Sequence, residues 1–408
     1  MSILDTITRT VETKISPALD QFLKRNWILK TVLLALLLSV VTSAPNTPAI
    51  LNPPFPQYLE KFQNPSFDIV KSGIPEATQA ANTNYRMGVP ILFNILHLHH
   101  PLALTYLLIL SVIASYGVFA LISRQIFEDR KLAFIATMYL AVTYNGSFSY
   151  PSVTYDQFTL LLIFLTMVRY RWSWVVGIFT FVALWCDERA YPGCLTAMGL
   201  HLLWAAHRDK KNGISFMGVI HGFKSVPVIV MLAAYTLAVL TRLWVKAQYD
   251  FTIPVGGGAV INAWVMNIRY YHVGTYYFLE GAWILVLTTL ISLYLRGKKG
   301  LVGLILCAGI PCTFLGFTVF DISRTFSFIF PAVLVIFFLL KHTEKEKNQL
   351  HLLTIVFVVS LIGGNYVIHS HKEGMLRWIR PLPVKLVEDK LMEIREDFFR
   401  RQGREDEI

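Results

Sequence analysis

The chain of 408 residues is 54% hydrophobic and 15% charged, with a mean hydropathy of +0.51. Apolar stretches close to the ~20 residues needed to cross a bilayer recur along it, and no Walker-type glycine-rich lysine loop is present. The formal net charge of +11 arises from Lys and Arg spread over short connections, so no nucleic-acid partner is expected. We therefore expect an all-α, polytopic transmembrane protein without a separate soluble catalytic domain.

The N-terminal segment 1–26 carries apolar residues at helical spacing, among them Ile7 and Val11. This pattern predicts an amphipathic helix that lies on the cytoplasmic surface of the membrane. A helix that pairs with another in a coiled coil is the alternative. The multi-span domain is predicted over 27–370, and 371–408 is predicted to form a charged C-terminal tail.

About ten or eleven membrane spans are predicted from the apolar runs that follow this helix. Several of the runs are short for a span. They cover residues 28–45, 102–122, 132–149, 157–168, 174–187, 191–206, 226–242, 276–295, 301–319, 325–340 and 350–368.

Lys and Arg concentrate in alternate connections between these runs. Because positively charged loops are retained in the cytoplasm, we predict that these connections are cytoplasmic. The remaining connections are then external, including the long segments 46–100 and 243–275, and the same count puts the charged tail outside. The basic connections contain Lys24, Arg25, Arg124, Arg130, Lys131, Arg169, Arg171, Arg208, Lys210, Lys211, Arg296, Lys298, Lys299, Lys341, Lys345 and Lys347.

Ionisable residues at the predicted external ends of the apolar runs are the main candidates for a functional site. A charge at the centre of a membrane helix costs about 2.5 to 3.5 kcal/mol on insertion scales, so such residues are functional hypotheses by default. We predict that they converge around one external cavity. Interfacial ion pairs, formed within each group, are the purely structural alternative. The candidates are Asp156, the consecutive Asp187, Glu188 and Arg189, and the pair Asp321 and Arg324.

The two long external segments add further candidates. Asp68 lies between Phe67 and Ile69, an apolar context able to bury a carboxylate, and Arg86 stands shortly before the next predicted span. Arg269 and His272 lie in a cationic, aromatic stretch of the second segment. A run of histidines, at positions 97, 99 and 100, suggests either a metal site or an interfacial polar cluster, and the polar cluster is favoured.

These residue types are suited to group transfer from a phosphorylated lipid. A carboxylate within hydrogen-bonding reach of an acceptor hydroxyl acts as a base, and burial raises its pKa toward the working pH. The planar guanidinium of arginine matches the oxygens of phosphate. Acids and arginines around one external cavity therefore indicate an acceptor-activating base beside a phosphate clamp.

The layout resembles the GT-C superfamily of membrane glycosyltransferases, which use polyprenyl-phosphate-linked sugars. The motifs that carry the resemblance are Tyr155-Asp156-Gln157-Phe158, Leu184-Trp185-Cys186-Asp187-Glu188-Arg189, and Asp321-Ile322-Ser323-Arg324 followed by Phe330-Pro331. The similarity covers most of the chain in layout, and each motif is short. One departure is that 46–100 contains no pair of adjacent acids, which many members show soon after their first span.

Membership implies an inverting transfer of a sugar from a polyprenyl-phosphate donor to a glycan, lipid or protein acceptor. Asp68 would be the base, Asp187 and Glu188 would orient the acceptor or an optional divalent cation, and four arginines would hold phosphate. A bacterial inner membrane with the site facing the periplasm or exterior is expected, although an endoplasmic reticulum membrane gives the same pattern. The phosphate-binding arginines are Arg86, Arg189, Arg269 and Arg324, with Asp156, His272 and Asp321 as further substrate-binding residues.

Three other functions remain open from the sequence. The main alternative is a transporter or flippase of a lipid-linked or anionic solute, for which broken helices in matching halves are typical. A membrane acyltransferase would need a central histidine, whereas His201, His221 and His369 are scattered over both predicted faces. An assembly factor would keep the arginines while its acids are inert. The four cysteines lie in or beside apolar runs and are interpreted as structural.

Overall fold

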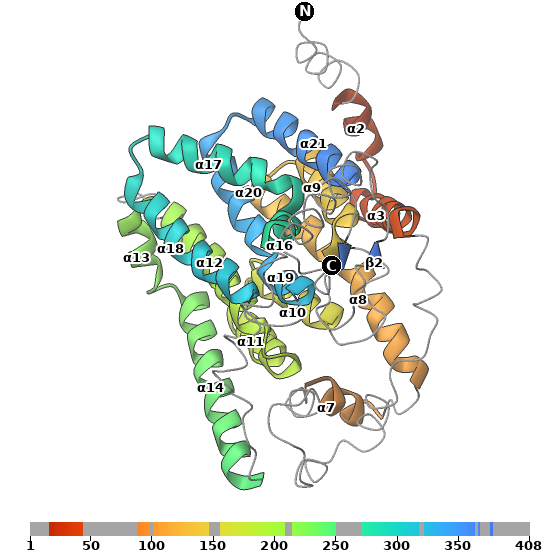
Figure 1. Ribbon diagram of the computed structural model, residues 1–408, viewed down its shortest axis with the longest axis vertical. Helices are drawn as coiled ribbons and strands as arrows, with labels where there is room; N and C mark the ends of the chain where they lie inside the picture. Colours follow the sequence, from red (N-terminus) through yellow and green to blue (C-terminus); the bar gives the residue numbers. More distant parts are fainter. Residues whose placement is uncertain are drawn as a thin grey trace, which may run out of the picture.

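The computed structural model describes nine stretches of the chain, which are almost entirely helical (Figure 1). Two strands of two residues each, β1 (Tyr366–Val367) and β2 (Leu376–Arg377), pair antiparallel. The prediction of a helical protein is confirmed. The described residues are 16–43, 88–97, 101–146, 156–208, 214–249, 271–317, 322–363, 366–367 and 376–377.

The helices follow the apolar runs of the sequence closely. The first group is α2 (Ser16–Phe22), α3 (Trp27–Ser43), α7 (Gly88–Ile95), α8 (Pro101–Phe127), α9 (Arg130–Val142), α10 (Asp156–Met167), α11 (Trp174–Cys186), α12 (Ala190–Arg208), α13 (Phe216–Gly222) and α14 (Val226–Tyr249). The second group is α16 (Tyr271–Leu279), α17 (Trp283–Leu295), α18 (Lys299–Gly316), α19 (Ile322–Ile329), α20 (Ala332–Thr343) and α21 (Glu346–Gly363). Short 3-10 turns, η4 (Tyr144–Gly146) and η7 (Glu280–Ala282), follow α9 and precede α17.

Three helical stretches in the described residues are long and apolar enough to cross a membrane: Tyr106–Phe127, Val226–Val245 and Thr325–Thr343. A fourth is obtained if α2 and α3, which meet at 112°, are one span. The remaining apolar helices are shorter. The described chain therefore contains three or four candidate spans where the sequence predicted ten or eleven. The shorter apolar helices are Asp156–Met167, Trp174–Cys186, Glu280–Leu295 and Lys299–Phe314.

The sharp turn between α2 and α3 depends on one asparagine. Asn26 has a φ of +52°, a left-handed conformation that asparagine tolerates better than most residues. Lys30 Nζ donates to the Phe22 carbonyl oxygen at 2.5 Å, which ties the end of α2 to the first turn of α3. Of the predicted interfacial helix over 1–26, the described residues begin at Ser16, and its position on the membrane surface stays a prediction.

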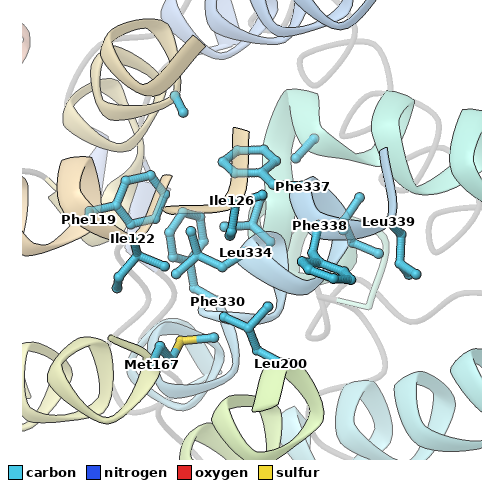
Figure 2. Packing of buried hydrophobic residues seen from close by; sticks show 14 of the residues in the cluster. Phe119, Ile122, Ile126, Met167, Leu200, Phe330, Leu334, Phe337, Phe338 and Leu339 are labelled. Atoms are coloured by element: carbon cyan, nitrogen blue, oxygen red, sulfur yellow. The ribbon is translucent and has the colours of Figure 1, made fainter. Parts of the chain in front are cut away.

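The core lies where α8 and α20 meet α10 and α12. Figure 2 shows Phe119 and Phe337 facing each other across this region, with Met167 and Leu200 beside Phe330. The ring centroids of Phe119 and Phe337 are 6.2 Å apart in an edge-to-face arrangement. Such aromatic pairs contribute about 0.5–1.5 kcal/mol beyond the burial of their area. Interlocked rings therefore hold the central helices in a fixed arrangement.

The connections rich in Lys and Arg contact one another, and we call this part of the molecule the basic end. Lys341 Nζ donates to the Phe127 carbonyl oxygen at 2.8 Å, and Lys298 Nζ donates to the carbonyl oxygen of Ile214 at 2.9 Å. Arg296 donates to a backbone carbonyl at the end of α20. Lys341 and Arg296 thus satisfy carbonyl groups at helix C-termini, where the helix dipole also favours positive charge, while Lys298 satisfies a carbonyl just before α13.

The opposite connections meet around η4. Ser39 Oγ donates to the carbonyl oxygen of Gly146 at 2.9 Å, and the hydroxyl of Tyr116 donates to the same oxygen. Gln157 Nε2 donates to the Asn145 carbonyl oxygen at 3.2 Å. Side chains from α3, α8 and α10 thereby satisfy the backbone where α9 ends. Since Gln157 adjoins Asp156, we call this region the acidic end; the side of the membrane that it faces stays a prediction.

Candidate functional site

Asp187 forms the corner between α11 and α12. Its backbone is extended, with φ −156° and ψ 134°, and its N–H donates to the carbonyl oxygen of Ala183 at 3.2 Å. Its Oδ1 accepts the backbone N–H of Arg189 at 2.9 Å, in the manner of a helix N-cap. One aspartate therefore ends α11 and starts α12, which fixes its carboxylate between the two helices.

Arg189 joins two carboxylates from different helices. Its Nε and Nη2 donate to the two oxygens of Asp187 at 2.9 and 2.7 Å, and Nη2 also lies 3.2 Å from Asp156 Oδ1. The exposed fractions of the three side chains are 10% for Arg189, 1% for Asp187 and 3% for Asp156. We call these residues the Asp156–Arg189–Asp187 triad. The ion pair required by the structural alternative is thus present, and a second acid extends it.

The triad contacts an aromatic ring of α19. The Arg189 guanidinium carbon lies 5.1 Å from the centroid of the Phe328 ring, a cation–π distance. Gly193, one turn into α12, allows this approach, since a Cβ atom at that position would lie 2.4 Å from the Phe328 carbonyl oxygen. The close packing of α12 and α19 therefore encloses the triad from a third side.

Several helices that carry predicted site residues meet at α19. This helix packs against α10, α12 and α16, so that the elements bearing Asp156, Arg189, His272 and Arg324 are neighbours. The side chains of His272 and Arg324 lie outside the described part of the structure, and Glu188 is half-buried. The predicted cavity and the roles of these residues stay predictions. Four candidates, Asp68, Arg86, Arg269 and Asp321, lie outside the described residues.

Glu280 is a buried acid that the sequence interpretation overlooked. It lies in η7 with 2% of its surface exposed, and its φ of +49° is a left-handed conformation that costs a non-glycine residue about 1–3 kcal/mol. Its Oε1 accepts the backbone N–H of Tyr144 at 3.2 Å. Its Oε2 is also buried, close to the side chain of Ser360. A single acid within the apolar run 276–295 was the available signal.

Arg242 is the second residue that was overlooked. It lies inside the candidate span Val226–Val245 and donates to the carbonyl oxygen of Leu184, close to the corner at Asp187. Its guanidinium carbon lies 5.6 Å from the Trp185 ring centroid. A lone arginine in an apolar run was again the signal, and the predicted boundary at residue 242 concealed it.

The triad can hold two carboxylates in fixed positions beside each other at formal net charge −1. Because its guanidinium already donates to both acids, Arg189 is best suited to orienting them. Among the described residues, no group of three or more His, Cys, Asp or Glu side chains is arranged to hold a metal ion. Of the histidines considered for acyl transfer, His201 is buried and its Nε2 donates to the Thr166 carbonyl oxygen at 2.8 Å.

Glu280 and the triad belong to one continuous polar region. The backbone of η4 connects them, since Tyr144 donates to Glu280 while the neighbouring Asn145 accepts from Gln157.

Comparison of the chain with protein-family models, with curated proteins and with solved structures finds no match. The geometry of these residues and the sequence motifs therefore carry the functional interpretation.

Proposed function

We propose that this protein is a membrane glycosyltransferase that moves a sugar from a polyprenyl-phosphate donor to an acceptor at the external face of a membrane. Three or four apolar helices long enough to span a membrane support a membrane location. The finer topology of ten or eleven spans, with a GT-C-like arrangement, is part of the proposal. So is the bacterial inner membrane as its compartment.

The observation that carries the proposal is the buried Asp156–Arg189–Asp187 triad. Charges this deeply buried are costly, and a well-packed apolar cluster in their place is often as stable or more stable. Their position at one end of the molecule, beside α19, supports a site for charged or hydroxylated substrates. The same residues belong to two of the motifs that resemble the GT-C superfamily.

Within this proposal each charged group has a distinct task. Asp187 and Glu188 orient the acceptor or an optional divalent cation, and Arg189 fixes the positions of Asp187 and Asp156. The base is assigned to Asp68, while Arg86, Arg269 and Arg324 hold the donor phosphate. Holding the base, the acceptor and the donor in a fixed arrangement before the reaction accelerates the transfer.

Transfer of radiolabelled sugar tests the proposal. Purified protein in lipid nanodiscs is supplied with a panel of polyprenyl-phosphate sugars, and Asp187→Asn and Asp68→Asn are compared with the exposed control Asp20→Asn. Loss of turnover in both site variants, with donor binding retained and the control unaffected, is expected. Donor binding without turnover by the unaltered protein, under all donor and acceptor combinations, would overturn the assignment as an enzyme.

A transporter or flippase is the second candidate, and Glu280 is the observation that favours it. Transport proteins place buried acids where a membrane helix is interrupted, and Glu280 lies at the interruption between α16 and α17. Gly281 supports this break, because its N–H donates to Ser360 Oγ at 3.0 Å instead of to the preceding helix.

Reconstituted vesicles separate the two candidates. Movement of a fluorescent lipid-linked sugar across the bilayer is measured for Glu280→Gln, with the exposed Glu346→Gln as control. Movement that depends on Glu280, without sugar transfer, would establish the transporter. Sugar transfer without protein-dependent movement would exclude it.

A further inference from the structure

The face of α14 that packs on α11 carries Arg242, the first charged residue along this helix. Val228, Met231 and Ala238 are buried along this stripe, and Arg242 follows at the next position of the helical repeat. Tyr235, seven residues earlier on the same face, donates its hydroxyl to the Tyr191 carbonyl oxygen at 2.5 Å. Arg242 is therefore held against the corner between α11 and α12 and cannot turn to the opposite side of α14.

The contacts of Arg242 in the described structure are all with uncharged groups. It donates to the carbonyl oxygen of Leu184, and its guanidinium carbon lies 5.6 Å from the Trp185 ring and 5.7 Å from the Tyr191 ring. No carboxylate of the described residues lies within salt-bridge distance of it. A partly buried cation in an apolar helix is therefore left without a counter-ion from this part of the chain.

Two hydrogen-bond donors at this contact are unsatisfied. Arg242 Nε and Trp185 Nε1 are both buried, and neither has a hydrogen-bond acceptor in the described structure. Trp185 is only 9% exposed, so its indole N–H is removed from bulk solvent. A guanidinium and an indole N–H on one contact match the acceptors of an anionic oxygen group such as phosphate. A purely structural role, in which Arg242 only caps α11, leaves both donors unexplained.

The position of Arg242 in the bilayer indicates where the anion comes from. It lies three residues before the end of the apolar window Val226–Val245, about 4.5 Å along the helix axis. The adjoining Leu243 and Trp244 are exposed, and only 28% of this window is buried inside the protein. Tryptophan at such a position is typical of the membrane interface, where lipid phosphates lie.

We propose that Arg242 and Trp185 bind the phosphate group of a membrane lipid at the acidic end of the protein. The lipid enters along the exposed face of α14. Its phosphate contacts the accessible edge of the guanidinium, and rotation of Trp185 brings the indole N–H to a second oxygen. Because Leu184 lies three residues before Asp187, the bound phosphate lies beside the corner that carries the triad. This site does not require that the protein transfers a sugar.

Equilibrium binding to the detergent-solubilised full-length protein tests the site. The probe is a radiolabelled short-chain polyisoprenyl phosphate, and the matched polyisoprenol without phosphate reports binding of the tail alone. Arg242→Gln is expected to raise the dissociation constant about tenfold or more, and Trp185→Phe about three- to tenfold. Arg242→Lys, which keeps the charge but loses the planar fork, is expected to fall between the original protein and Arg242→Gln.

Two variants serve as matched controls. Arg296→Gln removes an arginine that also donates to a carbonyl at a helix end, but at the basic end. Trp283→Phe removes an indole N–H that is already bonded, to the Thr275 carbonyl oxygen at 2.7 Å. Both are expected to bind the probe as the original protein does. Thermal unfolding of every variant is measured in the same detergent, and if Arg242→Gln is unfolded, Trp185→Phe and Arg242→Lys carry the comparison.

Competition identifies the source of the phosphate. Displacement of the probe by phosphatidylglycerol indicates a general lipid-phosphate site, and its failure to compete indicates selectivity for polyisoprenyl phosphate; both support the proposal. Equal affinity for polyisoprenol, equally strong competition by inorganic phosphate, or unchanged binding in folded Arg242→Gln and Trp185→Phe would each overturn it. Since sugar transfer is not measured, loss of the glycosyltransferase proposal leaves this result unaffected.

Discussion

The two ends of the molecule use charge in opposite ways. At the basic end, cations donate to neutral backbone carbonyls, as Lys341 does to Phe127, and much of the charge stays in contact with solvent. At the acidic end, Arg189 is buried between two carboxylates. The first arrangement anchors helix ends at little cost, whereas the second is costly to desolvate. A buried charge that is costly to desolvate is therefore stronger evidence for a functional site than a large number of exposed charges is.

Crowding of like charges distinguishes the basic end further. Desolvation lowers the pKa of Arg208, and neighbouring Arg169 lowers it further. Two predicted cytoplasmic connections are thus close enough to repel each other, which partly opposes their packing. Their concentration at one end is what the positive-inside bias would produce if these connections are cytoplasmic, as the sequence predicts.

The largest expected difference between the ends concerns removal of one cation. Arg189→Ala leaves two buried carboxylates without their counter-ion, so the free energy of unfolding is expected to fall by about 3–5 kcal/mol. Arg171→Ala, at the exposed connection before α11, is expected to change it by less than about 0.5 kcal/mol. Chemical unfolding in mixed micelles measures both. Equal effects of the two substitutions would show that the triad is not buried as described.

Loss of the buried acceptor at Glu280 is expected to cost less. Glu280→Ala removes the acceptor of the Tyr144 N–H, and we expect about 1–3 kcal/mol of destabilisation. Glu280→Gln keeps an acceptor oxygen and removes the cost of burying a charge, so it should be clearly more stable than the alanine variant. The same unfolding assay ranks them. A glutamine variant as unstable as the alanine variant would mean that the negative charge itself holds η4 and η7 together.

The close approach of α19 to the triad can be tested on two glycines of one helix. Gly193→Ala forces a methyl group against the Phe328 carbonyl oxygen, and about 1–3 kcal/mol of destabilisation is expected. A Cβ atom added at Gly199 would have no neighbouring atom within 4 Å, so Gly199→Ala should instead stabilise α12 by about 0.4–1 kcal/mol. Thermal unfolding of the two variants shows whether each substitution stabilises or destabilises the protein. Two stabilised variants would contradict the contact between α12 and α19.

The smallest effect is expected for an exposed ion pair at the basic end. Lys131 Nζ lies 3.1 Å from Asp20 Oδ2, and the Asp20 side chain is 63% exposed. Lys131→Gln is therefore expected to change the free energy of unfolding by less than about 1 kcal/mol, with the difference shrinking further in high salt. Unfolding at low and high ionic strength measures it. A larger, salt-independent loss would mean that the hydrogen bond from Lys131 Nζ to Ser16 Oγ, rather than the ion pair, holds α2 on α9.

The sequence predicted helices well where polar residues bound an apolar run. The run 174–187 corresponds to α11, because Asp187 cannot continue the helix while its carboxylate accepts the N–H of Arg189. The ion pair of Asp187 with Arg189, which the sequence offered as the structural alternative, is also observed, since one residue separates them in the chain. Local chemistry thus accounts for both results.

Contacts between distant segments were predictable only in outline. The run 276–295 was expected to be one continuous helix, yet it breaks at Glu280, whose left-handed backbone is stabilised by Tyr144, 136 residues away in sequence. No periodicity of apolar residues indicates such a break. Likewise, the exact partner of Asp156 depends on how α10 packs on α12, which the sequence pattern does not specify. Asp68, the proposed base, lies outside the described residues and stays a prediction.

The isolation of α14 has a consequence for how the protein responds to its bilayer. Figure 1 shows this helix running down one side of the molecule, and its main packing partner is α11. The apolar window of 20 residues is about 30 Å long, close to the hydrocarbon thickness of a typical bilayer. A thinner bilayer favours tilting of a helix that mostly faces lipid. Membrane thickness would then adjust the angle between α14 and α11, making this pair the mechanically compliant part of the protein.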